Sequence, residues 1–196
     1  MKTFVSAISL VLVISSLANA SLVDYDCAVS DSGTFQVTGF NIGPQGSDYS
    51  LDMDGIQYGQ SAHFSGFFKT NSKPITIEIS EQIINQTSFA WHGYKIYISM
   101  SKEFAIGQAA LPVGWTSLVK QPVFVSDENF GGWLGEIDFK GDVPIEYGDF
   151  VTLMFNLSFE GKTDFCTTHI ANPEPASLLL LGLGSLSLLG CKRLKH

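Results

Sequence analysis

The run VTLMFNLSF, Val151 to Phe159, is the strongest structural signal in this chain of 196 residues. Its odd-numbered positions hold Val, Leu, Phe, Leu and Phe, while Thr, Met, Asn and Ser lie between them. Because successive side chains of a β-strand point to opposite faces, this period of two predicts a strand with one face in a core. A helix would repeat its apolar positions every three to four residues instead.

The same alternation recurs along most of the chain. The clearest further runs are Ile75–Ser80, Tyr94–Met100 and Glu136–Lys140, and shorter candidates are Thr34–Phe40, Ser117–Ser126 and Asp164–Ile170. Pairs of turn-forming residues interrupt them and predict turns, at Gly43-Pro44, Asp54-Gly55, Gly131-Gly132 and Gly141-Asp142. Since no helical period is sustained there, we expect residues 21–171 to form one all-β domain, an antiparallel β-sandwich of the jelly-roll or Ig-like kind.

The first twenty residues have the composition of a targeting segment. Lys2 precedes an apolar run from Phe4 to Leu17, which closes with Ala18-Asn19-Ala20. A positive start, an apolar run and a small-residue cleavage site are the three parts of a secretory signal peptide. We therefore expect residues 1–20 to direct export through the Sec translocon and to be removed. An uncleaved N-terminal membrane helix is the alternative.

The end of the chain, 172–196, combines a proline-rich triplet, an uncharged stretch and a basic terminus. Pro173-Glu174-Pro175 precedes ASLLLLGLGSLSLLG, residues 176–190, in which eight of fifteen residues are Leu. As a helix this stretch would be about 22 Å long, somewhat short for a hydrocarbon core of about 30 Å. Apolar on all sides, it predicts a membrane helix rather than a core helix. The positive-inside rule would leave the basic stop in the cytoplasm, namely Lys192, Arg193 and Lys195.

This order of triplet, apolar helix and basic end resembles the PEP-CTERM sorting signal of exported bacterial proteins. The resemblance implies recognition of Pro173, Glu174 and Pro175 by an exosortase, a membrane-embedded cysteine transpeptidase. It also implies an inner-membrane intermediate, followed by delivery to the cell surface or the extracellular matrix. Asn172 departs from the pattern, in which Val is common at this position.

A second resemblance concerns the domain itself. The segment from Ile75 through Asn85-Gln86-Thr87 to Trp91 is similar to a pattern in many PEP-CTERM exported domains. In that pattern one strand ends in an Asn-x-Thr turn and the next strand begins with Trp. The similarity implies a fold and no activity.

The charge of the domain excludes one class of partner. Residues 21–172 contain seven Lys, no Arg and eighteen Asp or Glu, a formal charge of −11. A negative surface without arginine has nothing to neutralise a phosphate backbone. We therefore expect no nucleic-acid partner.

Two cysteines lie at opposite ends of the domain sequence, Cys27 and Cys166. In an oxidising compartment they could form a disulfide that ties the first strand to the last. Two free buried thiols are the alternative, and the sequence leaves both open.

No metal site or cofactor is predicted. His63, His92 and His169 are tens of residues apart, and ligand spacing is what makes a metal motif specific. Asp48, Asp52 and Asp54 form an acidic, turn-like stretch that lacks the fixed spacing and closing Glu of a calcium loop.

The strongest sign of an enzyme is the pair Glu136 and Asp138, two apart on an expected strand and so on one face. The pair is similar to the Glu-x-Asp motif of jelly-roll β-glucanases. A retaining glycosidase needs a second carboxyl group as acid/base about 5 Å from its nucleophile. Lys140 and Gly141 stand where that family has a Glu, so the acid/base group is missing.

The sequence therefore predicts an exported, non-enzymatic structural or adhesive module. A carbohydrate-binding module is the alternative, with extracellular polysaccharide as the ligand, because Trp91, Trp115 and Trp133 could stack on sugar rings. Burial of all three Trp would argue against sugar binding. A β-glucanase-like hydrolase has less support, for want of the partner carboxyl group.

Overall fold

The computed structural model describes residues 22–29, 34–45, 48–71, 74–126 and 131–173, and these form eleven strands and no helix. The strands are β1 (Leu22–Val29), β2 (Phe35–Gln45), β3 (Asp48–Gln57), β4 (Ser61–Thr70), β5 (Ile75–Asn85), β6 (Trp91–Met100), β7 (Phe104–Ala110), β8 (Trp115–Ser126), β9 (Gly131–Ile145), β10 (Phe150–Phe159) and β11 (Lys162–Pro173). The expected signal peptide, residues 1–20, and the residues after Pro173 lie outside the described residues.

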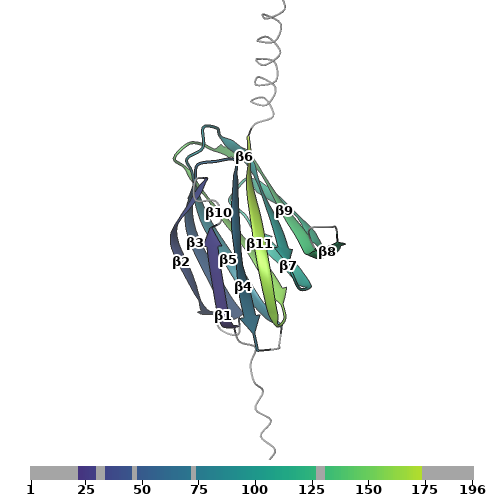
Figure 1. The fold of residues 1–196 in the computed structure, drawn as a ribbon. Coiled ribbons are helices and arrows are strands. Elements are labelled where there is room, and N and C mark those ends of the chain that lie inside the picture. Colours follow the sequence, from purple (N-terminus) through teal and green to yellow (C-terminus); the bar gives the residue numbers. More distant parts are fainter. Residues whose placement is uncertain (1–21, 30–33, 46–47, 72–73, 127–130, 174–196) are drawn as a thin grey trace, which may run out of the picture.

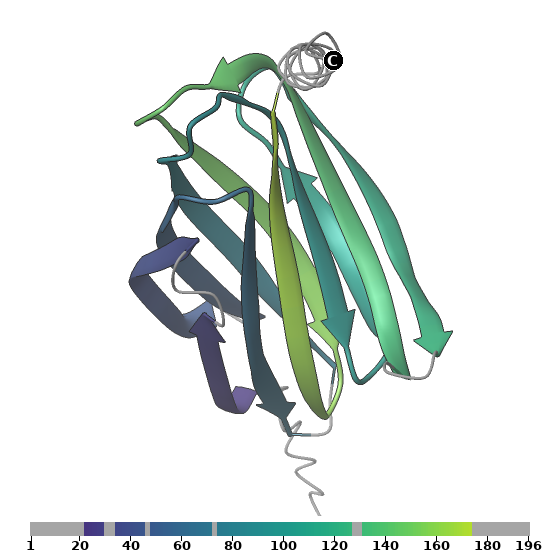
Figure 2. The same cartoon turned by 45° about the horizontal axis from the view of Figure 1, so that its top comes forward.

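The strands form two sheets that face each other across a shared core (Figures 1 and 2). The six-stranded sheet has the order β1-β4-β11-β6-β9-β8, and the five-stranded sheet has the order β2-β3-β5-β10-β7. Aromatic rings join the sheets: Phe35 meets Phe64 edge-on at 4.9 Å, and Phe68 lies 5.4 Å from Phe159. Burial of such rings supplies much of the stabilisation of a core.

The expectation of a purely antiparallel arrangement is wrong at one place, because β3 and β5 pair in parallel. Parallel neighbours need a crossover connection between them. Here β4 supplies it, since the chain leaves the five-stranded sheet after β3, passes through the six-stranded sheet and returns as β5. The other strand pairs described are antiparallel.

The strand predictions are confirmed where the alternation is long. All five odd-numbered apolar residues of β10 are buried, and the runs at 75–80, 94–100 and 136–140 lie in β5, β6 and β9. The shorter candidates correspond to parts of β2, β8 and β11. The sequence did not predict β1, β3, β4 or β7.

The four predicted turn pairs all lie in strands, so these turn predictions are wrong as placed. Gly43-Pro44, Asp54-Gly55 and Gly141-Asp142 lie inside β2, β3 and β9, and Gly131-Gly132 are the first two residues of β9. A side chain at Gly55 would overlap with the ring of Phe35. Glycine inside a strand often marks such a close approach.

The side-chain amide of Gln121 in β8 closes the gap beside the edge strand β7. Its Nε2 donates to the carbonyl oxygen of Ile106 at 2.6 Å, and its Oε1 accepts from the Ile106 backbone N–H at 3.1 Å. These are the two hydrogen bonds that a neighbouring strand would make. The amide therefore satisfies backbone groups of β7 that an edge strand would otherwise leave open.

Candidate functional site

The last described residue of β11, Pro173, is also the first residue of the expected sorting triplet. It lies opposite Trp91 at the start of β6, after an irregularity in the register between Asn172 and Pro173. Proline has no N–H to donate, so it suits the end of a ladder. The triplet therefore begins within the sheet itself. Glu174, Pro175 and the basic residues Lys192, Arg193 and Lys195 lie outside the described residues.

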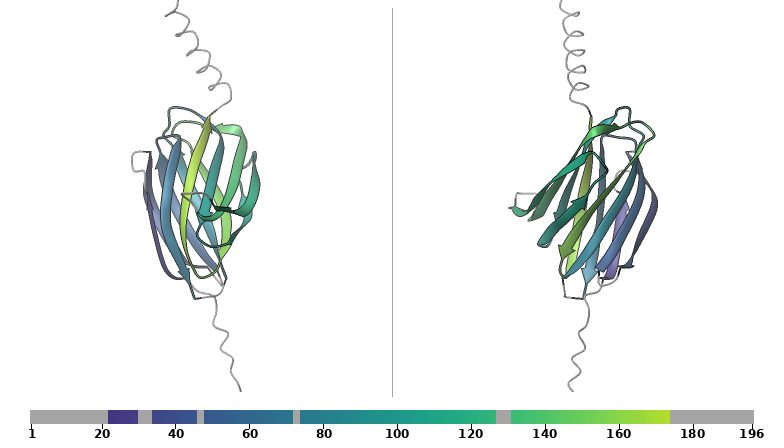
Figure 3. Two further views of the ribbon diagram at one scale, coloured as in Figure 1. Left: turned by 45° about the vertical axis from the view of Figure 1, so that its right-hand side comes forward. Right: turned by 180° about the vertical axis from the view of Figure 1, so that it is seen from behind.

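Three residues form a row across the end of the six-stranded sheet where β11 ends. Trp91 faces Pro173 on one side and Ile145, the last residue of β9, on the other. With strands about 4.8 Å apart, the Cα atoms of Ile145 and Pro173 are separated by about 10 Å. We call this the exit end; Figure 3 shows β11 reaching it in both views.

A buried hydrogen-bonded turn holds Trp91 at the exit end. Asn85 Oδ1 accepts from the Thr87 backbone N–H at 2.9 Å and from its hydroxyl at 2.7 Å. Asn85 Nδ2 donates to the carbonyl oxygens of Phe89 at 3.0 Å and Ile145 at 2.8 Å. The Thr87 hydroxyl in turn accepts from Trp91 Nε1 at 2.9 Å. The expected Asn-x-Thr turn followed by Trp is thus present, and it ties three strands together at this end.

A second polar cluster supports the end of β11 from the other sheet. The backbone N–H of Ala171 donates to the carbonyl oxygen of Gln60 at 2.9 Å. Gln57 Nε2 donates to the carbonyl oxygens of Gly59 at 2.9 Å and Gln60 at 3.2 Å, which fixes the turn between β3 and β4. The Tyr94 hydroxyl donates to Gln57 Oε1 at 2.5 Å.

This cluster continues into the core as a pair of buried ionisable groups. His169 Nδ1 lies 3.5 Å from Glu81 Oε2 and 3.5 Å from the Tyr94 hydroxyl. Burial raises the pKa of Glu81 to about 8. Burial, helped by the charge of His63, lowers the pKa of His169 to about 3. Both groups are therefore neutral near pH 7, as their low-dielectric surroundings require. Burial, and then the charge of Glu81, also raises the pKa of Tyr94.

Sequence reasoning missed this pair, although one signal was present. Glu81 is in phase with Ile75, Ile77, Ile79 and Ile83, all of which point into the core. A charged residue on the buried face of a strand needs a partner or a shifted pKa. Both residues are almost fully buried, 5% exposed for Glu81 and 1% for His169, so solvent does not reach them.

The other histidines and the acidic stretch do not form a metal centre. Among the described residues, no group of three or more His, Cys, Asp or Glu side chains is placed to hold a metal ion. His63 Nδ1 lies 3.1 Å from the Thr168 hydroxyl. Asp48, Asp52 and Asp54 are in the strand β3, so the expected acidic turn is wrong.

Glu136 and Asp138 lie on the outer face of the six-stranded sheet, as expected for alternate residues of one strand. Lys95 Nζ lies 2.9 Å from Glu136 Oε1 and 3.8 Å from Asp138 Oδ2. Lys120 lies 3.0 Å from Glu136, and Lys140 lies 3.7 Å from Asp138. The hydrogen bond from Lys95 is the main cause that lowers the pKa of Glu136. The ion pairs therefore keep Glu136 ionised, whereas the acid/base group that the sequence lacks would need a raised pKa.

Among the described cysteine side chains, Cys166 is exposed and its thiol is free. Cys27 lies opposite Gly66 on one side of β4, and Cys166 lies opposite Ser65 on the other. Two strand spacings separate their Cα atoms by about 10 Å, while a disulfide needs about 4.4–6.8 Å. The side chain of Cys27 lies outside the described residues, so the pairing stays a prediction, and one that the register disfavours.

Two of the three tryptophans are buried and one is half-buried, so the condition that would argue against sugar binding, burial of all three, is met only in part. Trp91 is 0% exposed and Trp115 is 6% exposed, so both belong to the core. Trp133 is half-buried, and its ring meets Phe124 edge-on at 5.9 Å and 69°. A sugar ring stacks on the flat face of an aromatic ring, which neither buried Trp offers.

The comparisons with known proteins bear on the exit end. Residues 173–193 match the family model of the PEP-CTERM protein-sorting motif. No curated protein and no solved structure matches the chain. No helix among the described residues is long and apolar enough to cross a membrane. The chain thus carries a PEP-CTERM sorting signal, which marks an exported protein that an exosortase processes at the membrane.

Proposed function

We propose that the domain is a non-enzymatic structural or adhesive module, delivered by the exosortase to the cell surface or extracellular matrix. In this proposal residues 1–20 are a cleaved signal peptide read by the Sec translocon, and residues 176–190 hold the chain in the inner membrane during processing. The two facing sheets favour a β-sandwich of the jelly-roll or Ig-like kind.

The observation that carries the proposal is the direct junction between β11 and the sorting triplet. β11 pairs with β4 over Lys162–Ile170 and with β6 over Phe165–Pro173. A force applied to Pro173 along β11 is therefore resisted by hydrogen bonds to both β4 and β6. The buried turn around Asn85 and Thr87 braces the same end. A module held by its C-terminal end gains from such a junction, whereas a flexible linker would be expected for a freely presented enzyme.

Binding of extracellular polysaccharide is the second candidate, and it cannot use Trp91 or Trp115, which are buried. Tyr97 is half-exposed on the outer face of the six-stranded sheet, with Lys95 Nζ 5.6 Å from its ring centre. The neighbouring Glu136 and Asp138 add hydrogen-bond acceptors. One aromatic ring among ion pairs is a modest platform, so we rank this candidate below the structural module.

Deletion of the gene in an organism that has an exosortase tests the proposal. We expect the deletion strain to lose surface attachment or matrix, and the wild-type chain to restore both. A Glu136→Gln chain should restore them as well, because no turnover is involved. Unchanged attachment and matrix after deletion would refute the module. Failure of Glu136→Gln, with β-glucan cleavage by the wild-type chain, would support a hydrolase.

A further inference from the structure

Exposed apolar side chains gather in the turns of the exit end. Val113 lies in the turn between β7 and β8, and Val143 and Tyr147 lie at the end of β9 and just beyond it. Phe150 begins β10. Their exposed fractions are 99%, 62%, 67% and 58%. We call these four residues the exit-end rim. Single exposed apolar residues are ordinary, but a group of them marks an interaction surface.

The β7–β8 turn, which carries Val113, lies beside both Val143 and Phe150. A side chain added at Gly114 would touch the methyl group of Val143, so the β7–β8 turn lies against the end of β9. Asp142 N–H donates to the carbonyl oxygen of Gly114 at 3.1 Å. Phe150 lines a depression of about 290 Å³. The other lining residues come from the end of β7, the β7–β8 turn and β10, namely Ala110, Leu111, Pro112, Val151, Thr152 and Met154.

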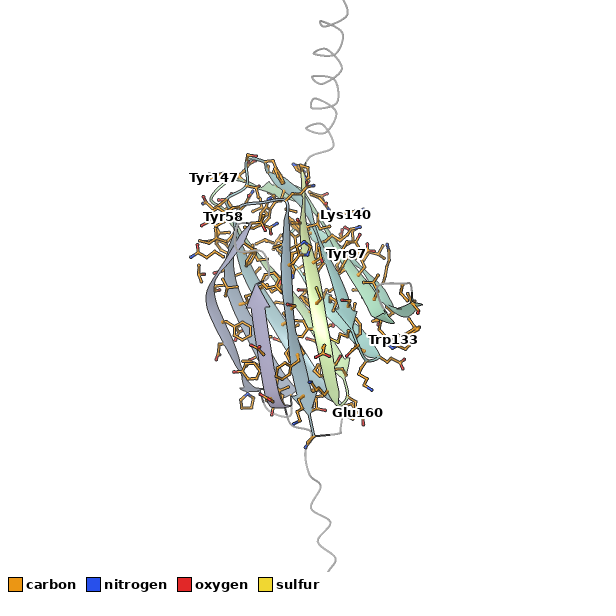
Figure 4. The ribbon with its side chains drawn as sticks, viewed as in Figure 1. Tyr58, Tyr97, Trp133, Lys140, Tyr147 and Glu160 are labelled. Atoms are coloured by element: carbon orange, nitrogen blue, oxygen red, sulfur yellow. The ribbon has the colours of Figure 1, made fainter. Side chains whose placement is uncertain are left out.

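The described turns at the opposite end of the domain are different, although β8 carries the exposed Val123 and Phe124 towards that end. These turns present Lys102, Glu103, Glu160 and Asn71 to solvent, and none of their residues is an exposed large apolar side chain. Figure 4 shows Tyr147 at the exit end and Glu160 at the other end. The apolar turns therefore belong to the end from which the sorting signal departs.

The rim lies close to the triplet that the exosortase reads. Tyr147 follows Ile145 by two residues, and Ile145 stands in the row with Trp91 and Pro173. An extended chain spans at most about 3.6 Å per residue, so Pro175 is within about 7 Å of Pro173. A cleft that encloses the triplet has to lie against this end of the domain, since no linker intervenes.

We infer that the exit-end rim is a docking surface for the exosortase. The inference rests on the proposed function, in that the exosortase must read the tail. The charges of the rim favour a protein partner over the lipid surface: Asp142, Glu146 and Asp149 are exposed among the apolar side chains. These carboxylates would be repelled by anionic lipid headgroups. They complement a partner surface that is apolar with basic groups.

The test follows tail removal from the full-length chain in cells that contain the exosortase, by pulse-chase and mass spectrometry. We expect Tyr147→Ser/Phe150→Ser to slow removal about tenfold, the size of effect typical of large apolar anchors. The matched control is Val123→Ser/Phe124→Ser, on β8 away from the exit end and equally exposed at 60% and 62%. The control should be processed at the wild-type rate. Equal rates for both double variants would overturn the inference.

A photo-crosslinker in place of Tyr147 identifies what touches the rim. We expect an adduct with exosortase peptides, lost when Glu174 and Pro175 are both changed to Ala. An adduct with lipid alone, or none in a chain that is still processed, would overturn the inference. The Glu174→Ala/Pro175→Ala chain also separates the two proposals. If it is processed like the wild type, the sorting function itself fails. If it is not processed while the rim variants behave normally, only the docking surface fails.

Discussion

The indole ring of Trp115 covers Gly141, the residue directly opposite it in the β8–β9 pair. A side chain at position 141 would overlap with the ring, and Trp115 Nε1 donates to the carbonyl oxygen of Val143 at 3.2 Å. An aromatic ring laid over a cross-strand glycine is a known means of fixing register. The pair also positions the end of β9, which carries Val143 of the exit-end rim.

Gly141→Ala should destabilise the domain, because the new methyl group must displace the indole. We expect a loss of about 1–3 kcal/mol in the free energy of unfolding, as for other overpacked sites. Urea unfolding followed by tryptophan fluorescence measures it. Gly131→Ala is the control, since nothing lies within 4 Å of a side chain there. Equal stability of the two variants would contradict the role of the pair.

Thr87→Val should destabilise the exit end by leaving the buried Trp91 N–H without its acceptor. An unsatisfied buried donor costs about 1–3 kcal/mol. Thr152→Val, in a half-buried position of β10, makes the same chemical change where no such acceptor is lost. Hydrogen exchange of the β6 and β11 backbone amides should rise near Trp91 in the first variant alone. Unchanged exchange at the end of β11 would contradict the bracing role of the turn.

Gln121→Ala should weaken the attachment of β7. It removes both hydrogen bonds to the Ile106 backbone, and we expect a loss of about 1–2 kcal/mol. Gln108→Ala changes an exposed glutamine on β7 itself and should be nearly neutral. The comparison uses thermal unfolding. A larger effect at Gln108 than at Gln121 would show that β7 is held by other contacts.

Glu81 should make the domain less stable as pH rises. Its pKa is about 8 in the folded state against 4.5 in the unfolded chain, so the folded state binds the proton more tightly. Stability contributed by the protonated group is complete below pH 4.5 and is lost as pH rises through 8. His169 acts in the opposite sense. Its folded pKa of about 3 lies below the usual 6.5, so stability is lost as pH falls from 6.5 towards 3.

Unfolding free energies from pH 4 to pH 9 test both signs. Glu81→Gln keeps the shape of the side chain and removes its titration. Relative to wild type, this variant should gain stability steadily between pH 4.5 and pH 8 and remain level above that. His169→Gln should remove the loss of stability below pH 6.5 and leave the change above that pH as in the wild type. A Glu81→Gln profile parallel to that of the wild type over this range would contradict the neutral state of the buried acid.

Cys166 should react with a maleimide in the folded, unreduced protein, because its thiol is exposed and free. Burial of part of the side chain raises its pKa, so the reaction should be slower than that of a free cysteine at neutral pH. Mass spectrometry of the labelled peptides locates the adduct, with Cys166→Ser as the control. Labelling that appears only after reduction would establish a disulfide instead.

Several features of the fold could be predicted from local patterns, because the alternation of apolar and polar residues along a strand shows which of its faces is buried. The alternation of β10 predicted which five side chains are buried, and the sequence 173–193 predicted the sorting signal that the family match confirms. β3 was not predicted, because two of its inward-facing residues, Gly55 and Gln57, are not large apolar residues. Gly55 packs against the ring of Phe35, and Gln57 accepts a hydrogen bond from Tyr94, and both of these partners lie on other strands.

What could be predicted from the sequence and what could not differ in the range of the interactions involved. The all-β character, the acidic surface and the exported, exosortase-directed fate follow from neighbouring residues in the chain, and such patterns need no knowledge of the fold. The order of strands in the two sheets does not, because it depends on contacts between residues far apart in sequence. Asn85 and Ile145 meet across 60 residues, and Glu81 and His169 become neutral only when the sheets close over them. The pairing of Pro173 with Trp91, which defines the exit end, also depends on such contacts between residues far apart in sequence.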